Sequence, residues 1–144
     1  MVLAVVVALG VCAVAVNAEA KAGAKKATGA KEVVWPADKL QFKEAAPGVS
    51  KAVLWGDPDK GAYGAVTRFT KGTKNALHTH SHQLKVVVIS GTFLYDSGSG
   101  ENKLGPGSYL LQPGGTKHTS GAGADADCVF FEESSGAFDM KPAK

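Results

Sequence analysis

From residue 33 onward, short runs of β-branched and aromatic residues alternate with residues that form turns. Such runs favour strands, whereas glycine, proline, asparagine and aspartate favour turns between them. The pattern predicts strands at Val53–Trp55, Tyr63–Phe69, Lys85–Ile89, Thr92–Tyr95, Tyr109–Gln112 and Val129–Phe131. After residue 32 no apolar run with helical spacing is long enough for a good helix. Many short strands at this spacing indicate an all-β sandwich, jelly roll or small barrel.

The apolar pattern and the turns predict the place of two strands, Lys85–Ile89 and the strand that begins near His118. Lys85–Ile89 is apolar on both faces, which predicts a central strand. Ser90-Gly91-Thr92 provides a tight turn after it, and Pro113-Gly114-Gly115 provides a later one. His118 follows the second turn, so we expect it at the start of a new strand, where a rigid element can hold it.

The first 20 residues differ from the rest of the chain. Val2 to Val16 form an apolar run without charge, and Ala18-Glu19-Ala20 has the small-x-small pattern of a cleavage site. This predicts a signal peptide over residues 1–20, cleaved after Ala20, and export to the periplasm or outside the cell. No lysine or arginine precedes the run, and an uncleaved amino-terminal anchor is the alternative. After cleavage the protein would have no membrane segment.

The distribution of charge argues against nucleic-acid binding, and the cysteine content argues against an intramolecular disulfide. The formal net charge is +3, and much of the excess lies in residues 21–32, a stretch of alanine, glycine and lysine that predicts a flexible basic linker. Residues 33–144 are then the folded domain, near neutral and without signs of a nucleic-acid groove. Cys12 lies in the signal segment, so Cys128 has no intramolecular partner, and we expect a buried thiol.

All four histidines fall into two short stretches, His78-Thr79-His80-Ser81-His82 and Pro113 to His118. Imidazole is a common ligand of transition metals in proteins. If the first stretch is a strand, alternation places His78, His80 and His82 on one face. The clustering therefore predicts a metal site built on strands.

The first stretch resembles a motif of the cupin superfamily. That motif reads Gly-x5-His-x-His-x3,4-Glu-x6-Gly, and the chain has Gly72, His78, His80 and Gly91 at the matching positions. Leu84 stands where the motif has glutamate.

The second stretch resembles the second cupin motif, Gly-x5-Pro-x-Gly-x2-His-x3-Asn. Here Gly107, Pro113-Gly114-Gly115 and His118 match, and Ala122 replaces the asparagine. Both motifs occur in the correct order within residues 50–134. The chain also resembles small single-domain bacterial cupins that carry a similar Trp-Gly-Asp-Pro and His-Thr-His pattern.

The resemblance implies a double-stranded β-helix of the jelly-roll type. It also implies that His78, His80 and His118 bind one divalent transition metal, an ion of iron, manganese, zinc, nickel or copper. Because Leu84 cannot ligate, three arrangements stay open: a three-histidine centre, a fourth ligand from His82, or a fourth ligand from Gln83. A cupin barrel that has lost its metal is a further alternative.

Two hypotheses about function follow from this resemblance. The first is a metal-dependent oxygenase acting on a small molecule, and the second is a non-catalytic module that binds a metal or small ligand as a sensor. Candidate catalytic residues are Arg68, the only arginine, and Glu132, which follows an apolar strand next to Glu133. Alternation predicts that one of the two glutamates points inward. Because cupins commonly pair, a homodimer is also expected.

Overall fold

The strands predicted from the apolar and polar pattern are present in the computed structural model, which describes residues 31–144. β3 and β8 have the predicted bounds, Tyr63–Phe69 and Tyr109–Gln112. The predicted signal peptide, Cys12 and most of the predicted linker lie outside the described residues. None of the described helices has the length and apolar character that crossing a bilayer requires.

The remaining elements are short, and most are strands. The one 3-10 turn, among the described residues, is η1 (Ala37–Lys39). The other strands are β1 (Lys43–Ala46), β2 (Val49–Gly56), β4 (Lys74–Thr79), β5 (Leu84–Ser90), β6 (Phe93–Asp96), β7 (Asn102–Leu104), β9 (His118–Ala122), β10 (Cys128–Ser134) and β11 (Lys141–Pro142).

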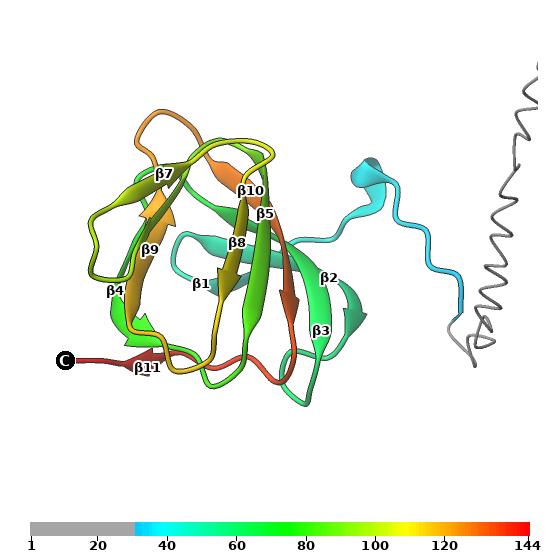
Figure 1. The fold of residues 1–144 in the computed structure, drawn as a ribbon. Helices are drawn as coiled ribbons and strands as arrows, with labels where there is room; N and C mark the ends of the chain where they lie inside the picture. The colour runs from blue at the N-terminus through cyan, green and yellow to red at the C-terminus, as the bar shows by residue number, and fades with distance from the viewer. Residues whose placement is uncertain (1–30) are drawn as a thin grey trace, which may run out of the picture. The chain divides into compact units, whose positions relative to one another are not determined.

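These strands form two antiparallel sheets that face each other as a jelly-roll barrel (Figure 1). One sheet has the order β1-β2-β3-β10-β5-β8, and the other has the order β11-β4-β9-β6-β7. The predicted fold class, an all-β double-stranded β-helix, is confirmed. β5 is an inner strand between β10 and β8, as its apolar sequence predicts.

The interior of the barrel changes from apolar to polar along the strands. At one end Phe69, Phe93 and Phe130 pack with ring centroids 4.9–5.8 Å apart, and Cys128 is fully buried beside them. Burial raises the pKa of the Cys128 thiol to about 11, so it is a neutral core residue, as expected.

Toward the other end the inward side chains become polar. On β10 the inward positions continue from Phe130 to Glu132 and Ser134, and on β9 they run from Ala122 through Ser120 to His118. The sequence thus builds an apolar core at one end of the barrel and a polar interior at the other.

The prediction of one strand face carrying His78, His80 and His82 is wrong. β4 ends at Thr79, and residues 81–82 form a bend before β5. The bend has a physical cause, because the Asp139 carboxylate accepts a hydrogen bond from the Ser81 backbone N–H at 2.6 Å.

β5 is buried on its inner face only. Val87 and Ile89 on its outer face are exposed, as are Tyr109 and Leu111 on β8. This apolar outer face is compatible with the expected homodimer, which stays a prediction.

Candidate metal centre

Three buried histidines meet at the polar end of the barrel. His78 lies near the end of β4 and His118 begins β9, and the two are directly opposite in the antiparallel pairing of these strands. His80 follows the end of β4. The ring centroids are 4.1 Å apart for His78–His118, 4.9 Å for His78–His80 and 5.2 Å for His80–His118. One nitrogen from each ring lies within 4.8 Å of the other two, so the rings can share one ion.

Backbone carbonyls orient all three rings. The Nδ1 atom of His78 is 2.6 Å from the Ala76 carbonyl oxygen, and that of His118 is 3.0 Å from the Thr116 carbonyl oxygen. The Nδ1 atom of His80 contacts the carbonyl oxygen of Asp139. Because a carbonyl oxygen only accepts hydrogen bonds, each Nδ1 carries the hydrogen and each Nε2 keeps its lone pair. Such carbonyl partners are typical of histidines that bind metals.

Burial favours the neutral form of two of these imidazoles. It lowers the pKa of His80, and it lowers the pKa of His118 to about 4 despite the opposing effect of the Thr116 hydrogen bond. At neutral pH the Nε2 lone pairs of His80 and His118 are therefore not occupied by protons, which is the state that metal binding requires.

Acid is expected to destabilise the metal-free protein through His118. An unfolded chain has a histidine pKa of about 6.5, so between pH 6.5 and 4 the unfolded state binds more protons and stability falls as the pH falls. The expected contribution is of the order of 3 kcal/mol across this window. Urea unfolding in a chelator should show a flatter pH profile for His118→Gln than for wild type. Equal slopes for His118→Gln and wild type would contradict the prediction.

The chemistry of the site fits a transition metal. Nε2 of His78 is buried and has no hydrogen-bond partner, which is costly unless another group fills the position. A divalent ion bound by three neutral imidazole nitrogens supplies that partner, and zinc, iron and copper accept this donor set.

A second polar cluster lies on the six-stranded sheet. The Tyr63 hydroxyl donates to Oε1 of Glu132 at 2.8 Å, and Lys51 Nζ donates to the Tyr63 hydroxyl at 3.1 Å and forms an ion pair with Oε1 of Glu132. Burial and the Glu132 charge raise the pKa of Tyr63, so its hydroxyl stays protonated. Alternation correctly predicted one inward glutamate, and it is Glu132.

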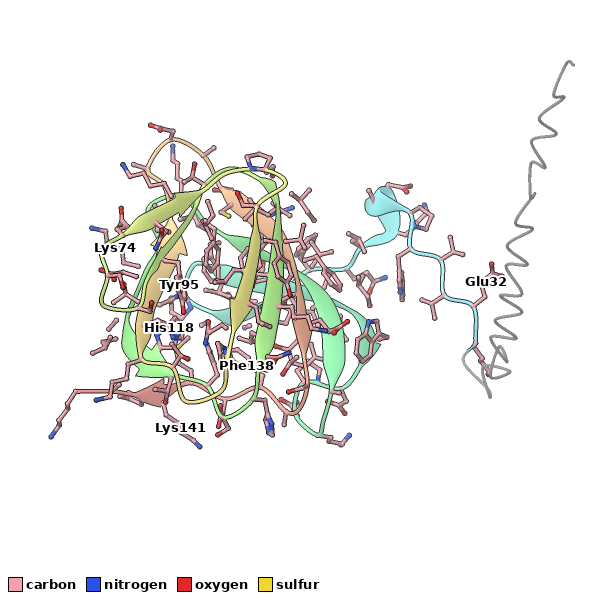
Figure 2. The ribbon with its side chains drawn as sticks, in the orientation of Figure 1. Glu32, Lys74, Tyr95, His118, Phe138 and Lys141 are labelled. Atoms are coloured by element: carbon pink, nitrogen blue, oxygen red, sulfur yellow. The ribbon has the colours of Figure 1, made fainter. Side chains whose placement is uncertain are left out.

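Phe138 lies between the histidines and this cluster. Its ring centroid is 5.3 Å from that of His80 and 4.2 Å from Lys51 Nζ. Figure 2 shows Phe138, His118 and Tyr95 in the same half of the barrel. Tyr95 stacks on His118 at 5.3 Å, so apolar rings flank the histidines.

Comparison with known proteins identifies the family. The sequence profile described as the ChrR cupin-like domain matches residues 30–137. The chain belongs to this cupin family. No curated protein matches the chain.

Solved structures share the fold of this cupin. KdgF from Halomonas sp. has a TM-score of 0.58 and 22% identity, over 69% of this chain and 92% of KdgF. The polyketide cyclase RemF from Streptomyces resistomycificus has a TM-score of 0.66 and 14% identity, over 79% and 87%. A chain in the complex of Rhodobacter sphaeroides SigE with the anti-sigma ChrR has a TM-score of 0.57 and 18% identity, over 69% and 51%. At these identities the likeness shows the fold alone.

This cupin departs from the motif at Leu84, which is buried at the start of β5. His82 does not join the three histidines: it is exposed, and its ring lies against Gly136. The contact that Gln83 makes here is through its backbone carbonyl, which accepts from the Ser135 N–H at 3.1 Å. A fourth ligand from Gln83 stays a prediction.

Gln112 is a site residue that the sequence did not single out. It pairs directly with Leu84 across β5 and β8, it is buried, and its Nε2 has no partner. Its amide therefore lies in the barrel interior next to the position that the motif glutamate would occupy. Strand alternation over Tyr109–Gln112 would have placed it inward, but only the pairing register brings it beside Leu84.

Arg68 lies on the other face of its strand. Its neighbours Thr67 and Phe69 are buried in the barrel, whereas its guanidinium stacks over the Phe42 ring at 4.4 Å. The structure does not bring this candidate to the three histidines. Lys51 and Tyr63, which the sequence analysis missed, take the place beside Glu132 instead.

Proposed function

We propose that this cupin binds one divalent transition metal through Nε2 of His78, His80 and His118, and a small molecule in the coordination positions that remain. The observation that carries the proposal is the common orientation of the rings. Every Nδ1 is held by a backbone carbonyl, while the Nε2 of His78 is buried without a partner. A histidine cluster that served only packing would have no need of this arrangement.

We further propose that the centre is that of a metal-dependent enzyme of the oxygenase type. A metal here would polarise an oxygen of a bound molecule, and a redox-active one would support oxidation. Glu132 is the proposed acid/base group, and the Lys51 ammonium and the Tyr63 hydroxyl hold its carboxylate in place. Leu84 cannot ligate, so a ligand oxygen would occupy the coordination position that the motif glutamate takes. Gln112, whose amide Nε2 has no partner, is the proposed hydrogen-bond donor to that oxygen.

Metal analysis of the purified protein tests these proposals. Stoichiometric iron, manganese or copper, with oxygen uptake on candidate substrates, would support the enzyme. Stoichiometric zinc without turnover would support a binding function. Absence of metal, with His78→Ala behaving like wild type, would exclude metal binding as the function.

The second candidate is a sensor that binds a metal or small ligand without turnover. The observation that favours it is the position of Phe138, which covers His80. The hollow between His80, Leu84 and Phe138 has no room for a water molecule. The family takes its description from ChrR, and ChrR is the anti-sigma protein in the structure with SigE. A regulatory protein with this fold is therefore already known.

Export is proposed from the sequence alone. If residues 1–20 are a signal peptide, amino-terminal sequencing of the protein from the periplasm or medium should begin at Lys21. A protein that retains Met1 and stays with the membrane fraction would support the uncleaved anchor.

A further inference from the structure

The chain end after β10 crosses the histidine end of the barrel from one sheet to the other. We call Ser135–Pro142 the strap. It starts at the six-stranded sheet, where the Ser135 N–H donates to the Gln83 carbonyl at 3.1 Å. It ends as β11, which pairs with β4 so that Lys141 is opposite Thr79 and Pro142 is opposite His78. Figure 1 shows β11 beside β4 at the lower end of the barrel, and Figure 2 labels Lys141 there.

Asp139 is the most connected residue of the strap. Its carbonyl oxygen accepts from Nδ1 of His80. Its carboxylate accepts from the backbone N–H and the hydroxyl of Ser81, each at 2.6 Å, and pairs with Lys141 Nζ at 3.1 Å. The carboxylate thus anchors the strap to the residue that follows His80, and this anchoring holds the carbonyl at the His80 ring.

His80 differs from the other two histidines in what orients it. The carbonyls that orient His78 and His118 come from two residues earlier in the same strand region. The carbonyl that orients His80 comes from 59 residues later in the chain. His80 also follows the end of β4, so its direction depends on the docked strap and on the β8–β9 turn, where the Gly115 N–H donates to the His80 carbonyl at 2.8 Å.

Phe138, the residue before Asp139, also packs against His80. Its ring packs on His80 and on the Lys51 ammonium, although the residue is still 40% exposed. Gly136 of the strap is buried, but most of its residues are exposed, and hydrogen bonds such as that from the Phe138 N–H to the Pro58 carbonyl at 2.7 Å hold it to the barrel. Such segments open at a lower free energy than core strands.

We infer that Asp139 is a positioning residue of the metal centre, and that docking of the strap and binding of the metal stabilise each other. This inference rests on the proposed metal function. The docked strap fixes His80 with its Nε2 toward the other histidines, which raises metal affinity. By linkage, a bound metal holds His80 in that orientation and stabilises the docked strap by the same factor.

Hydrogen exchange and zinc titration of the full-length protein test the coupling. In wild type, zinc should slow the exchange of amides in residues 135–142 about tenfold or more. Asp139→Ala should lower zinc affinity about tenfold, the usual range for removing a group that orients a ligand. Ser81→Ala, which removes one hydroxyl at an exposed position, should lower it by a smaller factor without risk to folding.

Asp127→Ala is the matched control. The Asp127 carboxylate also holds a backbone N–H, that of Lys71 at 2.9 Å, but lies at the opposite end of β10. The Asp127→Ala substitution should leave the zinc affinity unchanged. Two results would overturn the coupling and leave the proposed metal function standing. One is zinc binding that does not change the hydrogen exchange of residues 135–142. The other is equal zinc affinity in Asp139→Ala, Ser81→Ala and Asp127→Ala. Failure of wild type to bind zinc would overturn the proposed function, and the coupling with it.

Discussion

His118→Ala is expected to abolish high-affinity metal binding. The His118 ring lies closest to that of His78 and contributes one of three nitrogens that can meet at one ion. Two imidazoles from one short segment would remain, and Leu84 offers no replacement. Loss of a group that merely orients a ligand costs about 10–100-fold in affinity, so loss of the ligand itself should cost more than 100-fold.

Calorimetric zinc titration and thermal unfolding measure this loss. Zinc at 100 times its dissociation constant should stabilise the wild-type protein by about 2.7 kcal/mol, and His118→Ala should unfold at the same temperature with and without zinc. His82→Ala is the matched control, because His82 is exposed and lies outside the group of three. Zinc stabilisation that persists in His118→Ala, or that disappears in His82→Ala, would refute the proposed ligand set.

The parts of this site that follow from local sequence could be predicted. Runs of β-branched and aromatic residues between turn residues give the bounds of β3 and β8, and strand alternation gives one inward glutamate on β10, which is Glu132. The two cupin motifs name the three histidines because each motif is a short segment with fixed spacing. In these cases the residues that determine the structure lie close together along the chain.

The parts that depend on distant segments could not be predicted. β4 ends at Thr79 because the Ser81 N–H, just beyond it, donates to the carboxylate of Asp139 instead of to a neighbouring strand. Asp139 lies nearly 60 residues later in the chain. Strand alternation alone therefore misplaced His82. Likewise, Gln112 becomes a neighbour of Leu84 only through the pairing of β5 with β8. Hydrophobic periodicity shows which face a residue takes within its own strand, and it carries no information about the register between strands.

Glu132→Gln is expected to destabilise the protein by about 3–5 kcal/mol, because it leaves the buried Lys51 ammonium without its countercharge. The side chains of Lys51 and Glu132 are only 10% and 7% exposed, so water cannot replace the lost carboxylate. Tyr63→Phe, which removes a hydrogen bond from the same cluster but no charge, should cost only about 1 kcal/mol. Urea unfolding in a chelator measures both losses without a contribution from bound metal.

The double variant Lys51→Met/Glu132→Leu separates stability from function. Replacing a buried ion pair by apolar side chains of similar volume is often neutral or stabilising, so the double variant should recover most of the stability that Glu132→Gln loses. A double variant as unstable as the single one, or a single variant within 1 kcal/mol of wild type by this measure, would show that the pair is not the buried unit described here. If the double variant is stable and binds zinc but has lost activity or ligand binding, the ion pair serves the ligand rather than the fold.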